Sequence, residues 1–103
     1  MKRGIFNRYV DYVCKETGVS KDQLFQKNRS AKFSTARFLL YALCYQRPMT
    51  VVQIVDLMAE NGYEIARAGV QYGIEKIQEA NDVDANDFIS RGLNECSLEE
   101  SYA

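Results

Sequence analysis

The chain has 103 residues, which is enough for one domain with a hydrophobic core and too few for two such domains. Hydrophobic residues make up 47% of the sequence and the net charge is only −1, a composition typical of a folded chain rather than a disordered or strongly basic one. No uninterrupted apolar run approaches the roughly 18 residues of a membrane span, and Asn7, Arg8 and Asp11 interrupt any signal-peptide core, so we expect a cytoplasmic protein with no membrane partner.

The first half of the chain predicts three helices. Apolar residues spaced by three and four over residues 6–14 indicate a first helix, and Gly18 stands where that helix would end. Ser20 opens a Ser-x-x-Gln capping box, in which the two side chains satisfy free backbone groups at the start of a short second helix. A third helix is expected over residues 34–46, and because residues 38–45 carry no charge we expect it to be buried on all sides.

The second half predicts two further helices joined by a turn. A second capping box begins at Thr50 and starts a helix that runs to about Asn61. The pair Asn61-Gly62 indicates a turn with Gly62 in a left-handed conformation. A fifth helix is expected over residues 64–81, apolar on one face and polar on the other. Two helices joined by a short, Gly-containing turn form a helix-turn-helix pattern.

Two glycines interrupt this fifth helix. Gly69 and Gly73 lie four residues apart on one side of it, where each costs roughly 1 kcal/mol of helix stability relative to Ala. We therefore expect them to permit the close approach of another backbone, that of the central helix over residues 38–45.

Charge is divided unevenly along the chain. Residues 1–78 carry 12 Lys and Arg against 7 Asp and Glu, a net charge of +5, whereas residues 79–103 carry one Arg against 7 Asp and Glu, a net charge of −6. We expect residues 82–103 to form an acidic C-terminal tail able to form a short helix. A basic body with an acidic tail is a pattern typical of proteins that bind anions.

The positive charge is concentrated in residues 26–37, with the sequence QKNRSAKFSTAR. Four of these twelve residues are basic and none is acidic, and Ser, Thr and Asn lie between the charges. Arg and Lys supply positive charge, the hydroxyls supply further hydrogen-bond donors, and the buried helix that follows holds them in place. This stretch therefore predicts a phosphate-binding loop.

The order of these elements and two local motifs resemble a known family. The motifs are Lys27-Asn28-Arg29-Ser30 in the basic loop and the segment from Arg37 to Leu43. Over residues 5–78 the chain resembles the C-terminal DNA-binding domain of the bacterial replication initiator DnaA, which belongs to the Trp-repressor-like helix-turn-helix group. The resemblance implies a fold in which the basic loop contacts DNA phosphates and the second helix of the motif enters the major groove.

Residue roles follow from the resemblance position by position. It implies a minor-groove contact for Arg29 and phosphate contacts for Lys27, Ser30, Lys32 and Arg37, with Thr35 as a further hydroxyl in the same stretch. The family carries Asp-His-Thr-Thr at the start of its recognition helix, whereas this chain has Ala-Arg-Ala-Gly over residues 66–69. Ala and Gly cannot bond base edges, so base contacts are expected from Arg67 and Gln71, with Glu64 at the start of the helix.

Catalysis and metal binding are not expected. The chain has no His, so the commonest general base is missing, and a zinc site would need Cys and carboxylates alone. The three cysteines, Cys14, Cys44 and Cys96, are widely spaced and odd in number, which favours reduced thiols in the core over disulfides. We therefore expect no enzymatic activity, no metal and no cofactor.

The sequence thus predicts an all-α, compact domain of five to six helices that contains a helix-turn-helix, similar to the Trp repressor and to the DnaA C-terminal domain. Residues 1–81 form the predicted DNA-binding domain and residues 82–103 the acidic tail. The predicted function is binding of double-stranded DNA in replication initiation or transcription control. The alternative is a protein-interaction or assembly module that kept the fold without DNA binding, with a replication or transcription protein as its partner. The sequence does not predict an oligomeric state.

Overall fold

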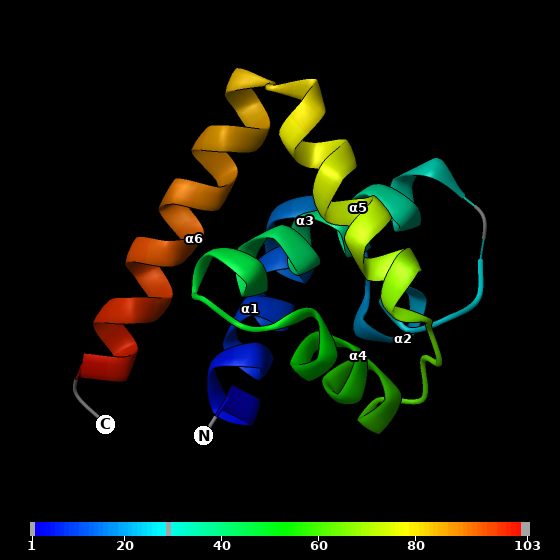
Figure 1. Ribbon diagram of the computed structural model, residues 1–103. Helices are drawn as coiled ribbons and strands as arrows, with labels where there is room; N and C mark the ends of the chain where they lie inside the picture. Colours follow the sequence, from blue (N-terminus) through cyan, green and yellow to red (C-terminus); the bar gives the residue numbers. More distant parts are fainter. Residues whose placement is uncertain (1, 29, 102–103) are drawn as a thin grey trace.

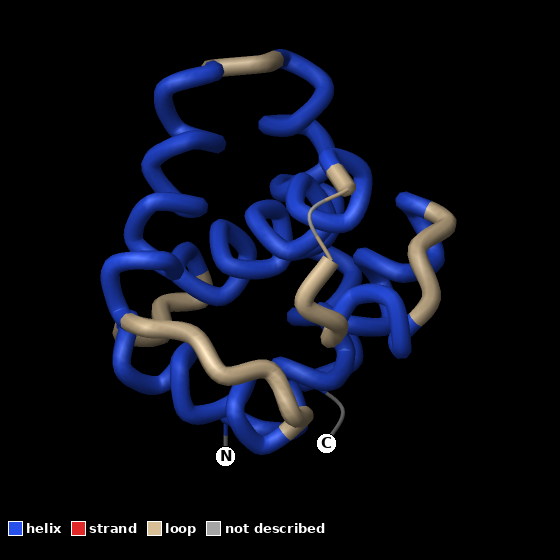
Figure 2. Tube along the Cα trace, turned by 90° about the vertical axis from the view of Figure 1, so that its right-hand side faces the viewer, coloured by secondary structure: helices blue, strands red, loops and turns tan. Residues whose placement is uncertain are grey.

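A central helix organises the structure. The computed structural model describes the backbone of residues 2–28 and 30–101 and the side chains of residues 3–28 and 30–96. These residues form six helices and no strand (Figures 1 and 2): α1 (Lys2–Thr17), α2 (Lys21–Leu24), α3 (Ala31–Gln46), α4 (Val51–Glu60), α5 (Arg67–Ala80) and α6 (Val83–Ser101). The predicted all-α class with five to six helices is confirmed. Within the described part of the chain, no helix combines the length and apolarity that crossing a membrane requires.

The predicted helix starts at Ser20 and Thr50 are confirmed in atomic detail. The Ser20 hydroxyl accepts the Gln23 backbone N–H at 3.1 Å, and the Gln23 side chain accepts the Ser20 N–H at 3.0 Å. Thr50 and Gln53 repeat the arrangement at 3.1 and 2.9 Å. Gly62 has the predicted left-handed conformation, with φ of 84°. These features could be predicted because each rests on residues at most three apart in the sequence.

The prediction that residues 38–45 form a helix buried on all sides is confirmed for residues 39–44, whereas Phe38 is half-buried and Tyr45 is 41% exposed. Helix α3 packs against each of the other five helices. Leu40, Leu43 and Cys44 are fully buried, and Tyr41 is 1% exposed. The core that surrounds them is supplied mainly by α1, α4 and α5, through Phe6, Tyr9, Val10, Val13, Ile54, Met58, Val70 and Ile74.

The expectation of an acidic tail is corrected by the structure. The segment forms the long helix α6, which turns back after Asn81 and packs on α1 and α3 (Figure 1). Phe88 and Cys96 are buried, and the Tyr12 hydroxyl donates to the Phe88 carbonyl at 2.6 Å. Arg91 bonds Glu16 of α1 at 3.2 Å. The segment is rich in carboxylates, so its apolar stripe was not recognised in the sequence. Through this stripe α6 packs into the same core as the rest of the domain.

The glycines of α5 have two different surroundings. A Cβ atom on Gly73 would lie 2.7 Å from Phe38 Cδ1 and 2.9 Å from Tyr41 Cδ2, so α3 is the expected neighbour, but its side chains and not its backbone make the close contact. A Cβ atom on Gly69 would instead meet the side chain of Ile65, 2.8 Å away. For Gly69 the expectation of contact with α3 is therefore wrong, because the crowding comes from the turn just before its own helix.

A glycine in α6 provides a test of how tightly this helix is packed. A Cβ atom on Gly92 would lie 2.7 Å from Tyr12 Cε2 and 2.9 Å from Leu43 Cδ2, and the Tyr12 ring is held by its hydroxyl bond. Gly92→Ala should lower the free energy of unfolding by about 1–2 kcal/mol, because overpacking outweighs the helix-propensity gain. Gly4→Ala is the matched control: no atom lies within 4 Å of that Cβ, so stability should rise. Urea unfolding of both variants is the measurement, and equal gains would contradict the packing of α6.

Candidate nucleic-acid interface

The basic loop and the turn before α5 meet at the ring of Tyr63. This residue follows Gly62 and is 8% exposed. The Lys27 ammonium lies 4.4 Å from the centre of the ring and the Arg37 guanidinium carbon 5.0 Å from it, both within the range of cation–π attraction. Lys27 also donates a hydrogen bond to the backbone carbonyl of Glu64. The loop is therefore attached to the connection between α4 and α5, 37 residues further along the chain.

Arg37 lies beneath this junction and holds the loop from within. Its side chain is 4% exposed. One terminal nitrogen, Nη1, donates to the carbonyls of Leu24 at 3.0 Å and Gln26 at 3.1 Å, and Nη2 donates to the carbonyl of Asn28 at 2.7 Å. The predicted phosphate contact of Arg37 is corrected accordingly. Its guanidinium donates to backbone carbonyls that accept no hydrogen bond within a helix. Arg37 therefore positions the loop rather than facing solvent.

Three other cations do reach the surface on this side of the molecule. Lys27 and Lys32 are exposed beside the loop, and Arg67 is exposed at the first position of α5. None of the three forms an ion pair with a described residue. By contrast, Arg3 and Arg91 are paired with Glu60 and Asp87 at 2.8 and 2.9 Å. Lys15, Lys21 and Lys76 are also exposed and form no ion pair with a described residue, so Lys27, Lys32 and Arg67 are one group of such cations among others.

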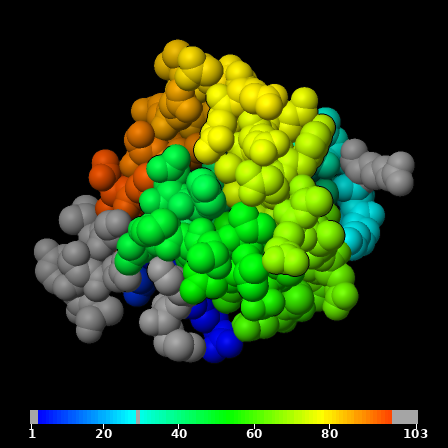
Figure 3. All heavy atoms as spheres, viewed as in Figure 1, coloured from blue at the N-terminus to red at the C-terminus, as the bar shows by residue number. Residues whose placement is uncertain are grey.

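The first turns of α3 and α5 begin without a capping side chain. Neither Ser30 before α3 nor Ala66 before α5 makes a side-chain capping bond, and neither first turn contains an acidic residue. The free N–H groups and the positive end of the helix dipole favour an anion at such a position. Helices α2 and α4 differ, since their capping boxes already use these groups. Figures 1 and 3 show the loop and the start of α5 on the same side, with α6 on the opposite side.

The remaining predicted residues of the loop and turn are placed as follows. Ser30 is exposed, and its N–H donates to the Asn28 side chain at 2.7 Å. Glu64 is exposed in the turn, because α5 begins at Arg67 and not three residues earlier as expected. Arg29, the predicted minor-groove residue, lies outside the described residues.

Thr35 and Gln71 occupy different positions relative to the loop. Thr35 is exposed on α3 but lines a separate groove with Phe38 of the same helix and Phe88 of α6. It is therefore not brought together with Lys27. Gln71 is exposed on α5, one turn after Arg67, and its amide donates to the Glu75 carboxylate at 3.2 Å.

Three residues of this surface had not been selected from the sequence. Asn28, Ser34 and Tyr63 line an open pocket with Lys27 and Arg37. Asn28 and Ser34 lie within residues 26–37, the basic stretch in which alternating charges and hydroxyls predicted a phosphate-binding loop. Tyr63 follows a turn and belongs to no periodic pattern, so its role depends on a contact that only folding creates.

The cysteines offer neither a disulfide nor a metal site. All three are free, and Cys44 is fully buried, which raises the pKa of its thiol well above the ordinary value. Burial, with a smaller effect of the nearby Asp11, also raises the pKa of Cys14. Among the described residues no three His, Cys, Asp or Glu side chains lie together as metal ligands.

Comparison with models of protein families, with curated proteins and with solved structures found no match for this chain. The resemblance to the DnaA C-terminal domain therefore remains an expectation carried by the motifs of the basic loop and of α3.

The positioning role of Arg37 can be tested by unfolding. Arg37→Leu keeps an apolar stem but removes the guanidinium donors from the Leu24, Gln26 and Asn28 carbonyls, of which Gln26 keeps the Asn28 N–H, and should cost about 2–4 kcal/mol of stability. Arg37→Lys should lower the free energy of unfolding by less than Arg37→Leu does, because one ammonium still bonds part of the site but cannot reach all three carbonyls. Urea unfolding is the measurement, with Lys32→Gln as an exposed control of unchanged stability. A neutral effect of Arg37→Leu would show that the loop does not need this support.

Proposed function

We propose that this protein binds double-stranded DNA through one surface, which we call the basic face: Lys27, Ser30, Lys32, Arg67 and the first turns of α3 and α5. The observation that carries the proposal is the joint contact of Lys27 and Arg37 with Tyr63. It holds a cationic loop beside the second helix of a helix-turn-helix. A duplex would then meet both elements at once, the loop along its phosphates and α5 at a groove.

Electrostatics supports contact with a polyanion rather than with a single acidic group. The exposed cations come from the loop, α3 and α5, so they are spread along a surface instead of converging on one point. The uncapped first turns of α3 and α5 add backbone donors that suit phosphate oxygens. Neutralising phosphates with such cations releases counter-ions from DNA, which supplies most of the affinity of sequence-independent binding.

The surface of α5 supports limited base reading at its N-terminal half. Arg67 and Gln71 are exposed one turn apart, and these side chains suit guanine and adenine respectively. Ala68 between them is exposed and small, which permits close approach of the helix to a groove. Glu75 and Glu79 are exposed on the C-terminal half, where they would repel phosphates. We infer that the first two turns of α5 enter the groove and that sequence preference is modest.

The position of α6 supports an orientation on DNA. Its carboxylates belong to a helix packed against α1 and α3, on the side away from the loop in Figure 1. A negative end fixed away from the basic face gives the domain an electrostatic polarity, which directs the basic face toward a duplex. A role in replication initiation or transcription control is consistent with such a domain.

The alternative function, a protein-interaction module, is favoured by a separate observation. An apolar groove of about 440 Å³ lies between α3, α5 and α6, with Phe38, Ile77 and Phe88 among its lining residues. Tyr72 and Val83 are large hydrophobic residues with exposures of 54% and 79%. Such surface suits a protein partner better than DNA.

Fluorescence anisotropy with a labelled duplex of mixed sequence tests DNA binding. The double variant Lys32→Gln/Arg67→Gln should weaken binding by roughly tenfold and reduce the slope of log K against log salt by about two, one for each lost phosphate contact. Lys15→Gln is the matched control, because Lys15 lies beside Asp11 and Glu95 at the α1–α6 side. That variant should bind like the unaltered protein.

Two results would contradict the proposal. The first is the absence of duplex binding by the unaltered protein at about 50 mM salt, where phosphate contacts are strong; the interaction-module function would then stand. The second is an equal loss of binding free energy per removed charge in Lys15→Gln and in the double variant, which would show that binding depends on overall charge and not on the basic face.

A further inference from the structure

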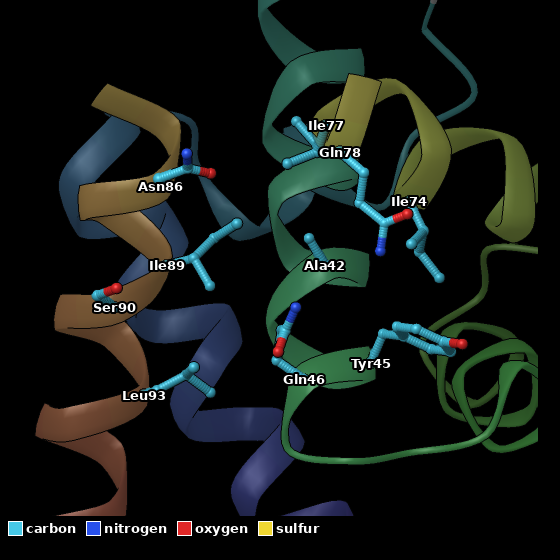
Figure 4. Close-up of a pocket in the computed structure, with 10 residues that line it drawn as sticks. All are labelled: Ala42, Tyr45, Gln46, Ile74, Ile77, Gln78, Asn86, Ile89, Ser90 and Leu93. Carbon is cyan, nitrogen blue, oxygen red and sulfur yellow. The ribbon is translucent and has the colours of Figure 1, made fainter. Parts of the chain in front are cut away.

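Two hollows of the domain surface differ in charge. The cleft in Figure 4 lies between α3, α5 and α6, has a volume of about 260 Å³ and is lined by ten residues, none of which is charged. The pocket beside the basic loop has a volume of about 440 Å³ and is lined by Lys27, Asn28, Ser34, Arg37 and Tyr63. We call it the loop pocket. Each of its five lining residues has a side chain that can donate a hydrogen bond, and none is acidic.

Arg37 brings to this pocket a charge that the described part of the chain does not neutralise. Arg37 is 4% exposed, and buried charges in proteins are normally paired with an opposite charge. Among the described residues Arg37 forms no ion pair, whereas the exposed Arg3 and Arg91 do pair with carboxylates. The backbone carbonyls that Arg37 contacts satisfy its N–H groups but carry no net charge. An anion in the loop pocket would supply the missing counter-charge.

Lys27 adds a second positive charge to the same pocket. Its ammonium and the Arg37 guanidinium carbon both lie within 5.0 Å of the centre of the Tyr63 ring. Two cations held against one ring repel each other, and an anion close to both would offset that repulsion. The hollow between α1 and α6 also contains two cations, but two carboxylates accompany them. The loop pocket therefore combines paired cations with the absence of an acidic lining residue.

The pocket also has hydrogen-bond donors that the protein leaves available to a ligand. The Asn28 side-chain oxygen accepts the Ser30 N–H at 2.7 Å, so its NH₂ group can donate elsewhere. Ser34 Oγ accepts from Arg37 at 3.5 Å, which leaves the hydroxyl proton for another acceptor. One N–H of the Lys27 ammonium bonds a backbone carbonyl and two remain. Together these groups can bond several oxygens of one phosphate group.

We propose that the loop pocket binds the phosphate group of a phosphate monoester. Such a group carries a charge of about −2 at pH 7 and has three terminal oxygens, which matches two cations and several donors. A phosphodiester inside a DNA strand carries one negative charge. The ligand is either the phosphorylated end of a DNA strand or a free nucleotide. The pocket shares Lys27 with the basic face, but the proposal does not rest on binding of duplex DNA, because the free monoester is a ligand by itself.

An NMR titration of the backbone amides with methyl phosphate and with dimethyl phosphate tests the proposal. Methyl phosphate should shift the amides of Asn28 and Ser34, and dimethyl phosphate should bind roughly tenfold more weakly because it carries one charge. Ser34→Asp should abolish binding, since the new carboxylate neutralises Arg37, and Lys27→Gln should weaken it roughly tenfold. Lys32→Gln is the matched control: it removes an exposed cation of the same loop region that does not line the pocket, and should bind methyl phosphate like the unaltered protein.

Two further probes separate the sources of the phosphate. Fluorescence anisotropy compares one blunt duplex with 5′-phosphate ends and with 5′-hydroxyl ends; tighter binding of the phosphorylated form assigns the pocket to a strand end. Equal binding of the two, with adenosine monophosphate bound at least as tightly as methyl phosphate, assigns it to a free nucleotide. The hydroxyl-ended duplex reports on the basic face alone, so failure of duplex binding is distinguished from failure of the pocket.

Three results would overturn the proposal. The first is the absence of shifts at Asn28 and Ser34 with methyl phosphate at about 10 mM, well above the concentration at which a millimolar ligand saturates half of its sites. The second is equal affinity for methyl phosphate and dimethyl phosphate. The third is unchanged affinity in Lys27→Gln, a variant of an exposed residue whose fold is checked by circular dichroism and the unfolding midpoint.

Discussion

The buried guanidinium of Arg37 is the interaction on which the proposed DNA-binding surface depends. An Arg side chain that is 4% exposed must find partners for its N–H donors, and the loop before α3 contains carbonyls that no helix uses. The bonds to Leu24, Gln26 and Asn28 satisfy both requirements at once. Because the same cation lies over Tyr63, the loop is tied both to the central helix and to the turn before α5. A short polar loop is thereby positioned without apolar side chains of its own.

Folding also determines how the uneven charge of the chain is distributed in space. The segment with a net charge of −6 would lie close to the basic loop if it were a free tail. Instead α6 packs on α1 and α3 through Phe88 and the close contact at Gly92. The described carboxylates of α6 are therefore held on a helix that packs on α1 and α3, on the side away from the basic loop.

The predictions succeeded where the physical cause is local. The capping boxes at Ser20 and Thr50 join residues three apart, and an uncharged helical run favours burial on all sides, which residues 39–44 show. The starts of α3 and α5 each differed from expectation by three residues, because neither helix has a capping side chain to mark its start. The helix α6 was underestimated because its apolar stripe is narrow and its acidic residues are numerous, so composition outweighed periodicity in the prediction.

The sequence by itself determined an all-helical domain, the two capped helix starts, the identity of the central helix and the presence of a basic loop. Only the tertiary structure decided which polar residues of that loop face solvent. Residue type cannot distinguish Arg37, which bonds carbonyls 9 to 13 positions away, from Lys27, which is exposed and bonds Glu64 37 positions away. The bond between Tyr12 and Phe88 spans 76 positions. Such contacts depend on which distant segments the core brings together, and no local pattern records that choice.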